Sequence, residues 1–542
     1  MRKTKPQDRQ ILTNTMTYLL SIIVFLPLFF LLIFCFVPSQ QSKIFKMGSV
    51  AVTFIQFVLS LVAYLVLPKG EQALIGITDM ATLGLVEKYT WIDVQIGQLG
   101  RFKIDYFLGI DGLNAALFVL STFVLWIGSV SSWEIQEKEK GYFSLYMLLS
   151  TSVTGCFVAL DFFLFFLFFE FMLLPMYFLI GLWGGKRREY AAVKFFIYTF
   201  LGSIFILIVL IGLYLSTQSF DMLAMTQLAN FRPDTVFHPA NDFTLFSFST
   251  REWAFILLFL GFIIKLPAVP MHTWLPDAHV EAPTPISVVL AGILLKVGGY
   301  GLIRTAYCIF PEIAFQFSFY VALIGVLSML YGAFVALGQT NLKRMIAYSS
   351  VSHMGFILLG LASATVEGIN GAIYQLFSHG ILSSMLFLCA GVIYSRTHHL
   401  EMENYRGLAS KMPQYAVLVT LAFFASLGLP TFSGFIGELM VFLGAFEAGA
   451  VGTLPLWLPM LSIFTLLIGA GYFLWTLQKM FFGKFSVKES IRVEALTDLT
   501  IREKLMLVTL GVLAVVFGLF PSLILNVSNS SVEYLVKILQ AK

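Results

Sequence analysis

Charged residues are scarce in this sequence. Asp, Glu, Lys and Arg together make up 12% of its 542 residues, and hydrophobic residues make up 58%. A soluble domain carries about 25% charged residues. The composition therefore excludes a soluble globular protein and predicts a chain that crosses a membrane many times. The formal net charge of +4 is small, and nothing in its distribution indicates a nucleic-acid partner.

Motifs for cofactors are missing as well. The four cysteines, Cys35, Cys156, Cys308 and Cys389, are isolated and form no CxxC pair. This predicts no iron–sulfur cluster, structural zinc or disulfide framework. No GxGxxG links a strand to a helix and no P-loop occurs, so we predict no flavin, nicotinamide or ATP site on this chain. If the chain serves a redox enzyme, the redox groups lie on other subunits.

Long apolar runs are what the sequence does contain. A window of about 20 residues predicts fourteen membrane helices and no soluble domain, at 15–37, 48–68, 110–132, 142–160, 161–183, 191–217, 252–268, 284–306, 313–337, 341–364, 367–395, 413–447, 453–482 and 503–527. No cleavage site follows the first run, so we expect it to be a retained helix. We expect the polar connections 69–108 and 218–250 to form small caps or hairpins.

An amphipathic segment, 272–281, follows the seventh helix, and the twelfth helix is interrupted at Gly428-Leu429-Pro430. We interpret His272 and His279 in this segment as structural or as lining an entry. They lack the HExxH spacing, so we predict no metal site.

Basic residues predict the orientation in the membrane. The loops after helices 1, 3, 5, 9, 11 and 13 carry lysine and arginine, whereas the short loops after helices 4, 8, 10 and 12 carry none. By the positive-inside rule, the first set is cytoplasmic and both termini lie on the outer side. The basic N-terminal tail argues for the opposite orientation.

Two helix breaks point to an internal repeat. Leu266-Pro267 in the seventh helix and Leu429-Pro430 in the twelfth lie five helices apart, so the two breaks have opposite membrane orientation. Interrupted helices at corresponding positions are typical of inverted-repeat transporters.

The segment 261–304 holds the first candidate site. Lys265 lies in apolar helix, where a charge costs roughly 2.5–3.5 kcal/mol on insertion scales, and Pro267 and Pro270 break the helix just after it. Broken backbone at membrane depth needs protein or a water-filled cavity around it, so we expect Lys265 to face a hydrated interior. Glu170, in a phenylalanine-rich helix, is its natural partner: a change in their separation would load or release a proton on the lysine. A purely structural ion pair is the alternative.

Four more ionisable residues lie in predicted helices. Lys296, near mid-span beside three glycines, is placed to receive a proton from Lys265, or else it snorkels to the interface. His353 and His379 suit a relay, because imidazole titrates near neutrality, or they are simply hydrogen-bonded in place. Glu438 follows the second break, where the positive end of a half-helix favours a carboxylate.

Long motifs in the chain resemble a known family. These are FFEFMLLPMYFLIGLWGG, IIKLPAVPMHTWLPDAHVEAPTPISVVLAGILLKVGGYGLIR, QTNLKRMIAYSSVSHMGF and FSHGILSSMLFLCAGVIY. They resemble the proton-translocating antiporter-like subunits of respiratory complex I over about residues 110–480. Among these paralogues the M (chain 4) group fits best. Glu438 stands where the L and N chains usually carry lysine, and the chain ends soon after its fourteenth helix.

The resemblance implies an all-α membrane fold in which helices 4–8 and 9–13 are inverted repeats, at about 142–306 and 313–482. It implies three parts: an N-terminal part (1–109), a translocation core (110–483) and a C-terminal part (484–542). By the same resemblance, proton translocation falls on Glu170 and Lys265 as a coupled pair, Lys296 as the central relay and Glu438 as the terminal group. His353 and His379 match further family positions.

The function that the resemblance implies is proton pumping in the membrane arm of NADH:quinone oxidoreductase. NADH, FMN, iron–sulfur clusters and quinone would then lie on other subunits, with chains L and N as neighbours, in a bacterial inner membrane. The nearest alternative is a subunit of a multisubunit Na⁺/H⁺ antiporter of the same fold. A purely structural membrane subunit is another, and a quinone-reducing enzyme is disfavoured by the missing redox motifs.

Overall fold

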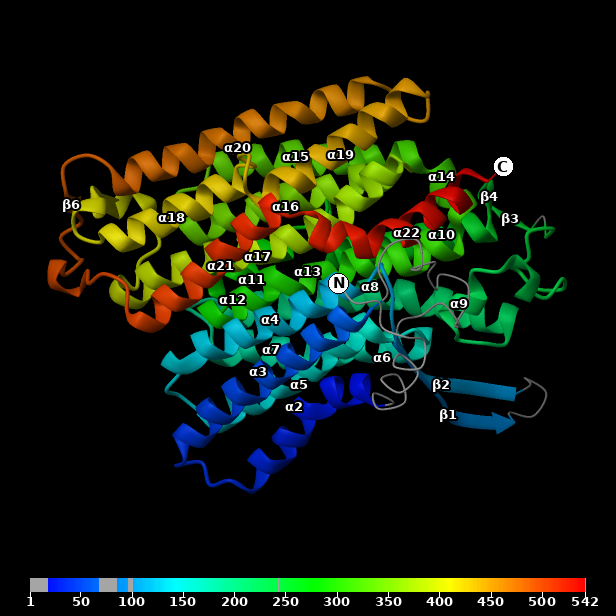
Figure 1. Ribbon diagram of the computed structural model, residues 1–542, viewed down its shortest axis with the longest axis horizontal. Helices are drawn as coiled ribbons and strands as arrows, with labels where there is room; N and C mark the ends of the chain where they lie inside the picture. Colours follow the sequence, from blue (N-terminus) through cyan, green and yellow to red (C-terminus); the bar gives the residue numbers. More distant parts are fainter. Residues whose placement is uncertain (1–17, 68–84, 96–100, 242, 542) are drawn as a thin grey trace, which may run out of the picture.

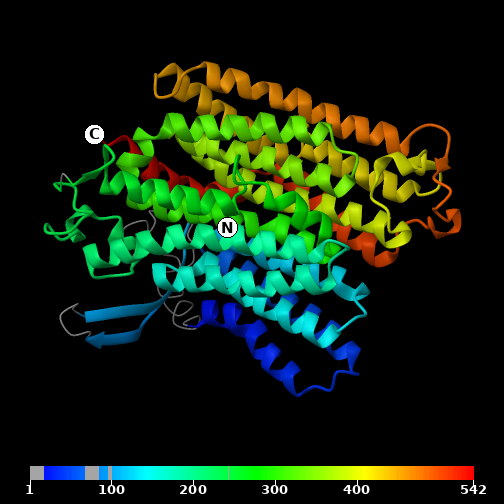
Figure 2. The same ribbon diagram turned by 180° about the vertical axis from the view of Figure 1, so that it is seen from behind.

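The computed structural model describes residues 18–67, 85–95, 101–241 and 243–541. Within these residues the predicted helical membrane fold is confirmed. They contain 12 helices long and apolar enough to cross a membrane, or up to 13 if one bent pair counts as a span. The helices run side by side along the long axis of the molecule (Figure 1 and Figure 2). The basic N-terminal tail and parts of the connection 69–108 lie outside the described residues.

Each membrane helix is an apolar run whose backbone groups are satisfied within the helix, as a lipid environment requires. The helices are α2 (Leu19–Phe36), α3 (Ser42–Val66), α4 (Ala115–Ser131), α5 (Glu139–Val158), α6 with α7 (Phe162–Phe171, Leu173–Trp183), α8 (Arg188–Thr217), α10 (Thr250–Lys265), α12 to η7 (Thr284–Tyr307), α15 (Ser318–Leu337), α16 (Leu342–Ala362), α17 (Val366–Thr397), α18 with α19 (Pro413–Ser426, Ser433–Ala450), α20 (Trp457–Phe481) and α21 with α22 (Ile501–Leu519, Ser522–Gln540).

Every predicted helix has a counterpart in that set, with two differences. The seventh, α10, has only 16 residues because it ends at Lys265. The predicted fourteenth helix, 503–527, is wrong in extent: α21 stops at Leu519, and α22 turns away from it by 59°. Pro521 explains the turn, because proline lacks an N–H and disfavours helical backbone in the residue before it.

The two polar connections form small structures, as expected, as far as they are described. β1 (Leu85–Gln95) pairs antiparallel with β2 (Arg101–Ile110), and this hairpin projects from one end of the bundle (Figure 1). The second connection contains the short helix α9 (Met222–Met225) and two short strands, β3 (Thr244–Leu245) and β4 (Phe248–Ser249).

The bundle contains an internal repeat that appears in its backbone pairing. Asp161 forms an isolated antiparallel bridge with Asp221, and Asn341 forms one with Glu401. Corresponding members of the two bridges are 180 residues apart in sequence. The first residue of each bridge also caps the helix that follows, α6 and α16 respectively, through its side chain.

The helix ends before the two bridges repeat as well. The segments 214–222 (YLSTQSFDM) and 394–402 (YSRTHHLEM) each end a long helix, at Gln218 and His398, and both residues have a left-handed φ of 55°. One bridge adjoins α9 and the other adjoins the small sheet that includes β6 (Ser486–Val487), and these lie at opposite ends of the molecule (Figure 1). The repeats are therefore inverted, as predicted.

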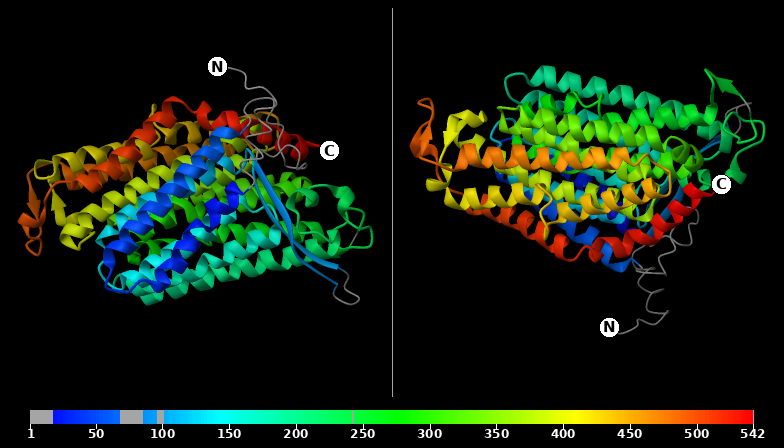
Figure 3. Two further views of the ribbon diagram at one scale, coloured as in Figure 1. Left: turned by 60° about the horizontal axis from the view of Figure 1, so that its bottom comes forward. Right: turned by 90° about the horizontal axis from the view of Figure 1, so that it is seen from above.

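The loops that carry the predicted cytoplasmic basic residues gather at one end of the bundle, which we call the basic end. It contains the loops α2–α3, α4–α5, α7–α8, α15–α16, α17–α18 and α20–α21, at the left in Figure 1. The β1–β2 hairpin, α9 and the C-terminus lie at the other end, which we call the hairpin end. Figure 3 shows the same division from two further sides.

Candidate functional site

The first helix break lies directly after Lys265, the last residue of α10. Pro267 and Pro270 follow, and the chain becomes helical again at α11 (Trp274–Glu281). The Trp274 indole N–H donates to a carbonyl in the last turn of α10 at 2.8 Å, so the segment after the break satisfies a free helix end. Lys265 is only 2% exposed, and its Nζ atom has no hydrogen-bond partner.

Glu170 lies near the C-terminal end of α6, just before the chain is interrupted at Met172. Its side chain is half-buried, and its Oε1 has no hydrogen-bond partner. Glu170 and Lys265 do not touch, since the Lys265 Nζ makes no hydrogen bond. It lies instead over the Phe169 ring, 4.1 Å from the ring centroid. The structure thus places the predicted pair in one neighbourhood, beyond contact distance.

Lys296 lies in a span that alternates between α- and π-helix. Its parts are α12 (Thr284–Val289), η6 (Leu290–Leu294), α13 (Leu295–Gly301) and η7 (Leu302–Tyr307). The Lys296 side chain is buried, and its Nζ donates to the Ala291 carbonyl at 2.5 Å. The alternative that Lys296 snorkels to the membrane interface is therefore wrong, because its amino group is held inside the protein. Single π-turns are rare and occur mostly at functional sites.

A row of buried ionisable side chains runs from Lys296 to Glu438. The Lys296 Nζ lies 2.8 Å from the His379 Nδ1. The ring centroids of His379 and His353 are 5.3 Å apart, and the His353 Nε2 lies 3.7 Å from the Glu438 Oε1. Helices α13, α17, α16 and α19 each supply one of these residues. The structure therefore brings four of the six predicted site residues into one row.

A small cavity joins the two histidines to Glu438. It measures about 10 Å³, and its polar lining comes from His353, Gln375, His379, Ser383, Ser426 and Glu438. A polar space of about 10–15 Å³ holds one water molecule. One water in this cavity would complete a hydrogen-bonded row between groups that do not touch directly.

The second helix break separates α18 from α19 and contains Pro430. Gly428 and Thr431 in this break both have left-handed backbone, with φ of +70° and +84°. Glu438 lies in the second turn of α19. The carboxylate thus stands close to a helix N-terminus, where the helix dipole favours negative charge.

Sequence reasoning missed several buried ionisable residues, among them Arg304, Asp111 and Lys343. Arg304 Nη2 binds both carboxylate oxygens of Asp111 at 2.6 Å, and the two side chains are 1% and 0% exposed. Lys343 is also buried, and its Nζ donates to the Ala282 carbonyl at 2.9 Å. The signal was present, because Arg304 and Lys343 fall inside the predicted eighth and tenth helices, where any ionisable residue is a candidate.

His279, interpreted as structural or as lining an entry, is completely buried. Its ring stacks on Phe387 with centroids 4.3 Å apart. Both Lys343 and Lys296 act on it electrostatically. His279 is therefore within electrostatic reach of both Lys343, near the basic end, and Lys296, the first residue of the row.

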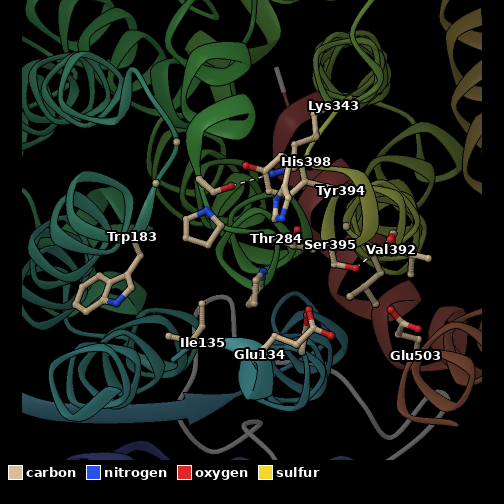
Figure 4. Close-up of a pocket in the computed structure, with 18 of the residues that line it drawn as sticks. Glu134, Ile135, Trp183, Thr284, Lys343, Val392, Tyr394, Ser395, His398 and Glu503 are labelled. Carbon is tan, nitrogen blue, oxygen red and sulfur yellow. Dashed lines mark hydrogen bonds between the residues drawn. The ribbon is translucent and has the colours of Figure 1, made fainter. Parts of the chain in front are cut away.

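The basic end opens into a cavity of about 520 Å³, which we call the vestibule. Residues of 131–136, 183–185, 280–285, 388–398 and 502–507 line it, together with Lys343. In Figure 4, Lys343, Tyr394 and His398 lie together on one side of the vestibule, and Trp183 lies across from them. The vestibule thus lies between the two repeats, over the N-terminus of α12.

Comparison with known proteins shows which family this chain belongs to. Residues 159–469 match the family described as NADH:quinone oxidoreductase/Mrp antiporter, TM. NADH-quinone oxidoreductase subunit M of Rhodobacter capsulatus is 36% identical over 531 residues, which cover 96% of this chain and 97% of that protein. NADH-quinone oxidoreductase subunit M of Rickettsia conorii is 38% identical over 520 residues, which cover 96% of this chain and 98% of that protein.

Two solved structures have the same fold. A chain of respiratory complex I from Thermus thermophilus with bound NADH has a TM-score of 0.79 at 28% identity, covering 96% of this chain and all of that chain (100%). A chain of the Mrp complex from Dietzia sp. also has a TM-score of 0.79, with 98% of this chain and 100% of that chain covered. Its identity is only 18%, so this likeness shows the fold alone.

Inverted repeats with buried lysines, histidines and glutamates at and between two helix breaks define the class of antiporter-like membrane subunits. The curated relatives narrow this class further. The chain belongs to the family of NADH-quinone oxidoreductase subunit M.

Proposed function

We propose that this chain is a proton-pumping membrane-arm subunit of NADH:quinone oxidoreductase, in which buried side chains carry the protons. The observation that supports this most is the contact between Lys296 Nζ and His379 Nδ1 at 2.8 Å, because it continues through His353 to Glu438. A row of this kind lets a proton pass between helices without bulk water. The protein family supports this assignment over the Na⁺/H⁺ antiporter alternative.

In the first half of the path, Glu170 and Lys265 act as the loading switch. Two unit charges attract by about 4 kcal/mol at 4 Å and ~2 kcal/mol at 8 Å when the effective dielectric constant is about 20. A closure from about 8 Å to about 4 Å would therefore bias the protonation of Lys265 by about 2 kcal/mol. Emptying a mostly protonated site takes about 5.5 kcal/mol. The pair alone supplies less than half of this, so the switch needs electrostatic input from outside the chain, which quinone reduction elsewhere in the complex would provide.

The vestibule is the intake for protons in this scheme. It opens at the basic end, which the positive-inside rule assigns to the cytoplasm, and both termini then lie on the outer side. Lys343 borders the vestibule, and His279 lies within electrostatic reach of Lys343 and Lys296. These two residues would connect the intake with the central lysine. Glu438 would handle release or pass the signal on.

The redox groups of the enzyme belong to other subunits in this proposal. NADH, FMN, the iron–sulfur clusters and quinone would bind there, since the sequence lacks their motifs and no group of three or more His, Cys, Asp or Glu suited to a metal occurs in the described part of the chain. Neighbouring antiporter-like chains L and N would flank this one in a bacterial inner membrane, and protons would be the ions that it transports. The bacterial relatives support this location.

The test begins with a tagged chain purified in mild detergent and assayed for co-purifying NADH:quinone reductase activity with flavin and iron–sulfur signals. Activity in proportion to the chain is expected. Recovery of membrane subunits without NADH oxidation would favour the antiporter alternative instead. In the purified complex, Glu170→Gln should abolish pumping, while Glu189→Gln, at the exposed start of α8, should leave it unchanged. Loss of assembly alone in Glu170→Gln would favour the structural alternative.

A further inference from the structure

The Glu438 carboxylate lies directly against the backbone of the second helix break. An idealised Cβ atom placed on Gly428 would lie 2.2 Å from the Glu438 Oε2 and 3.1 Å from its Cδ. Real Cβ atoms essentially never lie within 3.0 Å of another heavy atom. The carboxylate therefore occupies the space that any side chain at position 428 would need.

The other oxygen of the same carboxylate faces the proton path. Glu438 Oε1 lies 3.7 Å from His353 Nε2, and both residues line the small cavity that joins them to His379. Glu438 is only 6% exposed. The carboxylate is thus held between an imidazole on one side and the Cα of a glycine on the other.

Two effects favour glycine at position 428: its backbone conformation and the space that the Glu438 carboxylate occupies. Gly452 is a control that shares only the first effect. The φ of +70° at Gly428 is strained for residues with a side chain. Gly452, in the exposed loop after α19, has a φ of +84°, but nothing lies within 4 Å of an idealised Cβ there. Alanine at 452 therefore meets backbone strain alone, whereas alanine at 428 meets the same strain and the Glu438 carboxylate.

We propose that Gly428 is a positioning residue for proton transfer at Glu438. The missing side chain lets the carboxylate fold back into the helix break and stand in line with His353. Alanine at 428 would displace the carboxylate by about an ångström, and a misplacement of that size in a reacting group costs up to ~10²-fold in rate. Gly428 acts only through Glu438, so this inference rests on the proposed role of Glu438 in the proton path.

The experiment compares protons pumped per NADH oxidised by the complete complex in proteoliposomes. Gly428→Ala should lower this ratio several-fold, and Gly452→Ala should match the wild type. Glu438→Gln should also lower it, and Gly428→Ala combined with Glu438→Gln should be no worse than Glu438→Gln alone. The infrared carboxyl band that Glu438→Gln removes should shift in Gly428→Ala and stay in place in Gly452→Ala.

A compensating substitution tests the geometry itself. Glu438→Asp shortens the side chain by one methylene and withdraws the carboxylate from the break, so Gly428→Ala with Glu438→Asp should pump more than Gly428→Ala alone. If Gly428→Ala fails to assemble, restored assembly in this double variant supports the inference, and continued failure overturns it.

Two outcomes overturn the positioning role: equal pumping in Gly428→Ala and Gly452→Ala, or an additive loss when Gly428→Ala is combined with Glu438→Gln. Normal pumping in Glu438→Gln is a different result. It would remove Glu438 from the proton path and so refute the proposed function at this residue, whatever Gly428→Ala does.

Discussion

Arg304 and Asp111 form an ion pair in the interior of the bundle, with both Asp111 carboxylate oxygens 2.6 Å from the Arg304 Nη2. The pair joins η7, two turns beyond Lys296 in the same span, to the turn between β2 and α4. The Arg304 Nε–H also donates to the Tyr300 hydroxyl oxygen at 3.2 Å. The span that holds the central lysine is thus anchored at the hairpin end by a charge pair.

Breaking this pair should destabilise the protein strongly. Asp111→Asn leaves the Arg304 charge buried and uncompensated, which costs about 3–5 kcal/mol, and the apparent unfolding temperature of the purified complex should fall. Arg304→Met combined with Asp111→Leu removes both charges and should cost less than either single change. Arg232→Gln is the control, because its pair with Asp234 is exposed (51% and 68%) and is worth about 0–1 kcal/mol. Equal effects in the buried and exposed pairs would contradict this prediction.

The contact between Lys296 and His379 should be seen as coupling in a double-mutant cycle. Lys296→Gln and His379→Gln should each reduce protons pumped per NADH by tenfold or more, since each interrupts the row. The double variant should lose little beyond either single one, because groups that act as a unit are not additive. Lys484→Gln, in an exposed loop, should pump normally. Losses that multiply in the double variant would show that the two residues act separately.

Single residues can be recognised in the sequence when they stand out from their surroundings. A charge inside an apolar run is conspicuous, so Glu170, Lys265, Lys296 and Glu438 could be named as candidates without a structure, and prolines marked both helix breaks. The contacts could not be predicted from the sequence, because Lys296 and His379 are 83 residues apart in the chain and Arg304 and Asp111 are 193 residues apart. Such pairings follow from how the helices pack.

The end of the bundle was mispredicted for a different reason. Pro521 is a helix breaker that can be recognised in the sequence, but the apolar run continues past it. Polar contacts of α22 then fix the turn, including the Ser528 hydroxyl, which donates to Asn370 Oδ1 at 2.8 Å. Hydropathy records only the apolar run, so it cannot detect a turn that packing stabilises.

Lys343 should control intake from the vestibule. Lys343→Gln removes the cation that borders the vestibule and faces the Ala282 carbonyl, so pumping should fall several-fold while NADH oxidation with an artificial electron acceptor stays normal. Arg344→Gln is the matched control, since its side chain is 39% exposed and lies 3.7 Å from Asp277. A similar loss in both variants would mean that the basic end acts through its overall charge and not through Lys343.

Asp161 and Asn341 occupy the same place in the two repeats but differ in their ability to titrate. Each caps a helix, with Asp161 Oδ1 accepting from the Leu164 N–H at 3.0 Å and Asn341 Oδ1 accepting from the Arg344 N–H at 3.2 Å. Burial, with the charges of Asp105 and Asp221, raises the pKa of Asp161 from its ordinary value of 3.8 to about 7. The hydrogen bonds from the Leu164 and Asp105 backbone oppose this rise only in part.

This difference predicts a pH dependence at the hairpin end. Because the folded protein binds the Asp161 proton more tightly than the unfolded chain, this residue stabilises the fold below pH 3.8, and the contribution is lost as the pH rises to about 7. Asp161→Asn keeps the cap, since asparagine caps as well as aspartate, and removes the titration. The unfolding temperature of the wild type should therefore fall relative to that of Asp161→Asn between these pH values. The exposed control Asp234→Asn should follow the wild type, and parallel curves for wild type and Asp161→Asn would show that Asp161 is already ionised throughout this range.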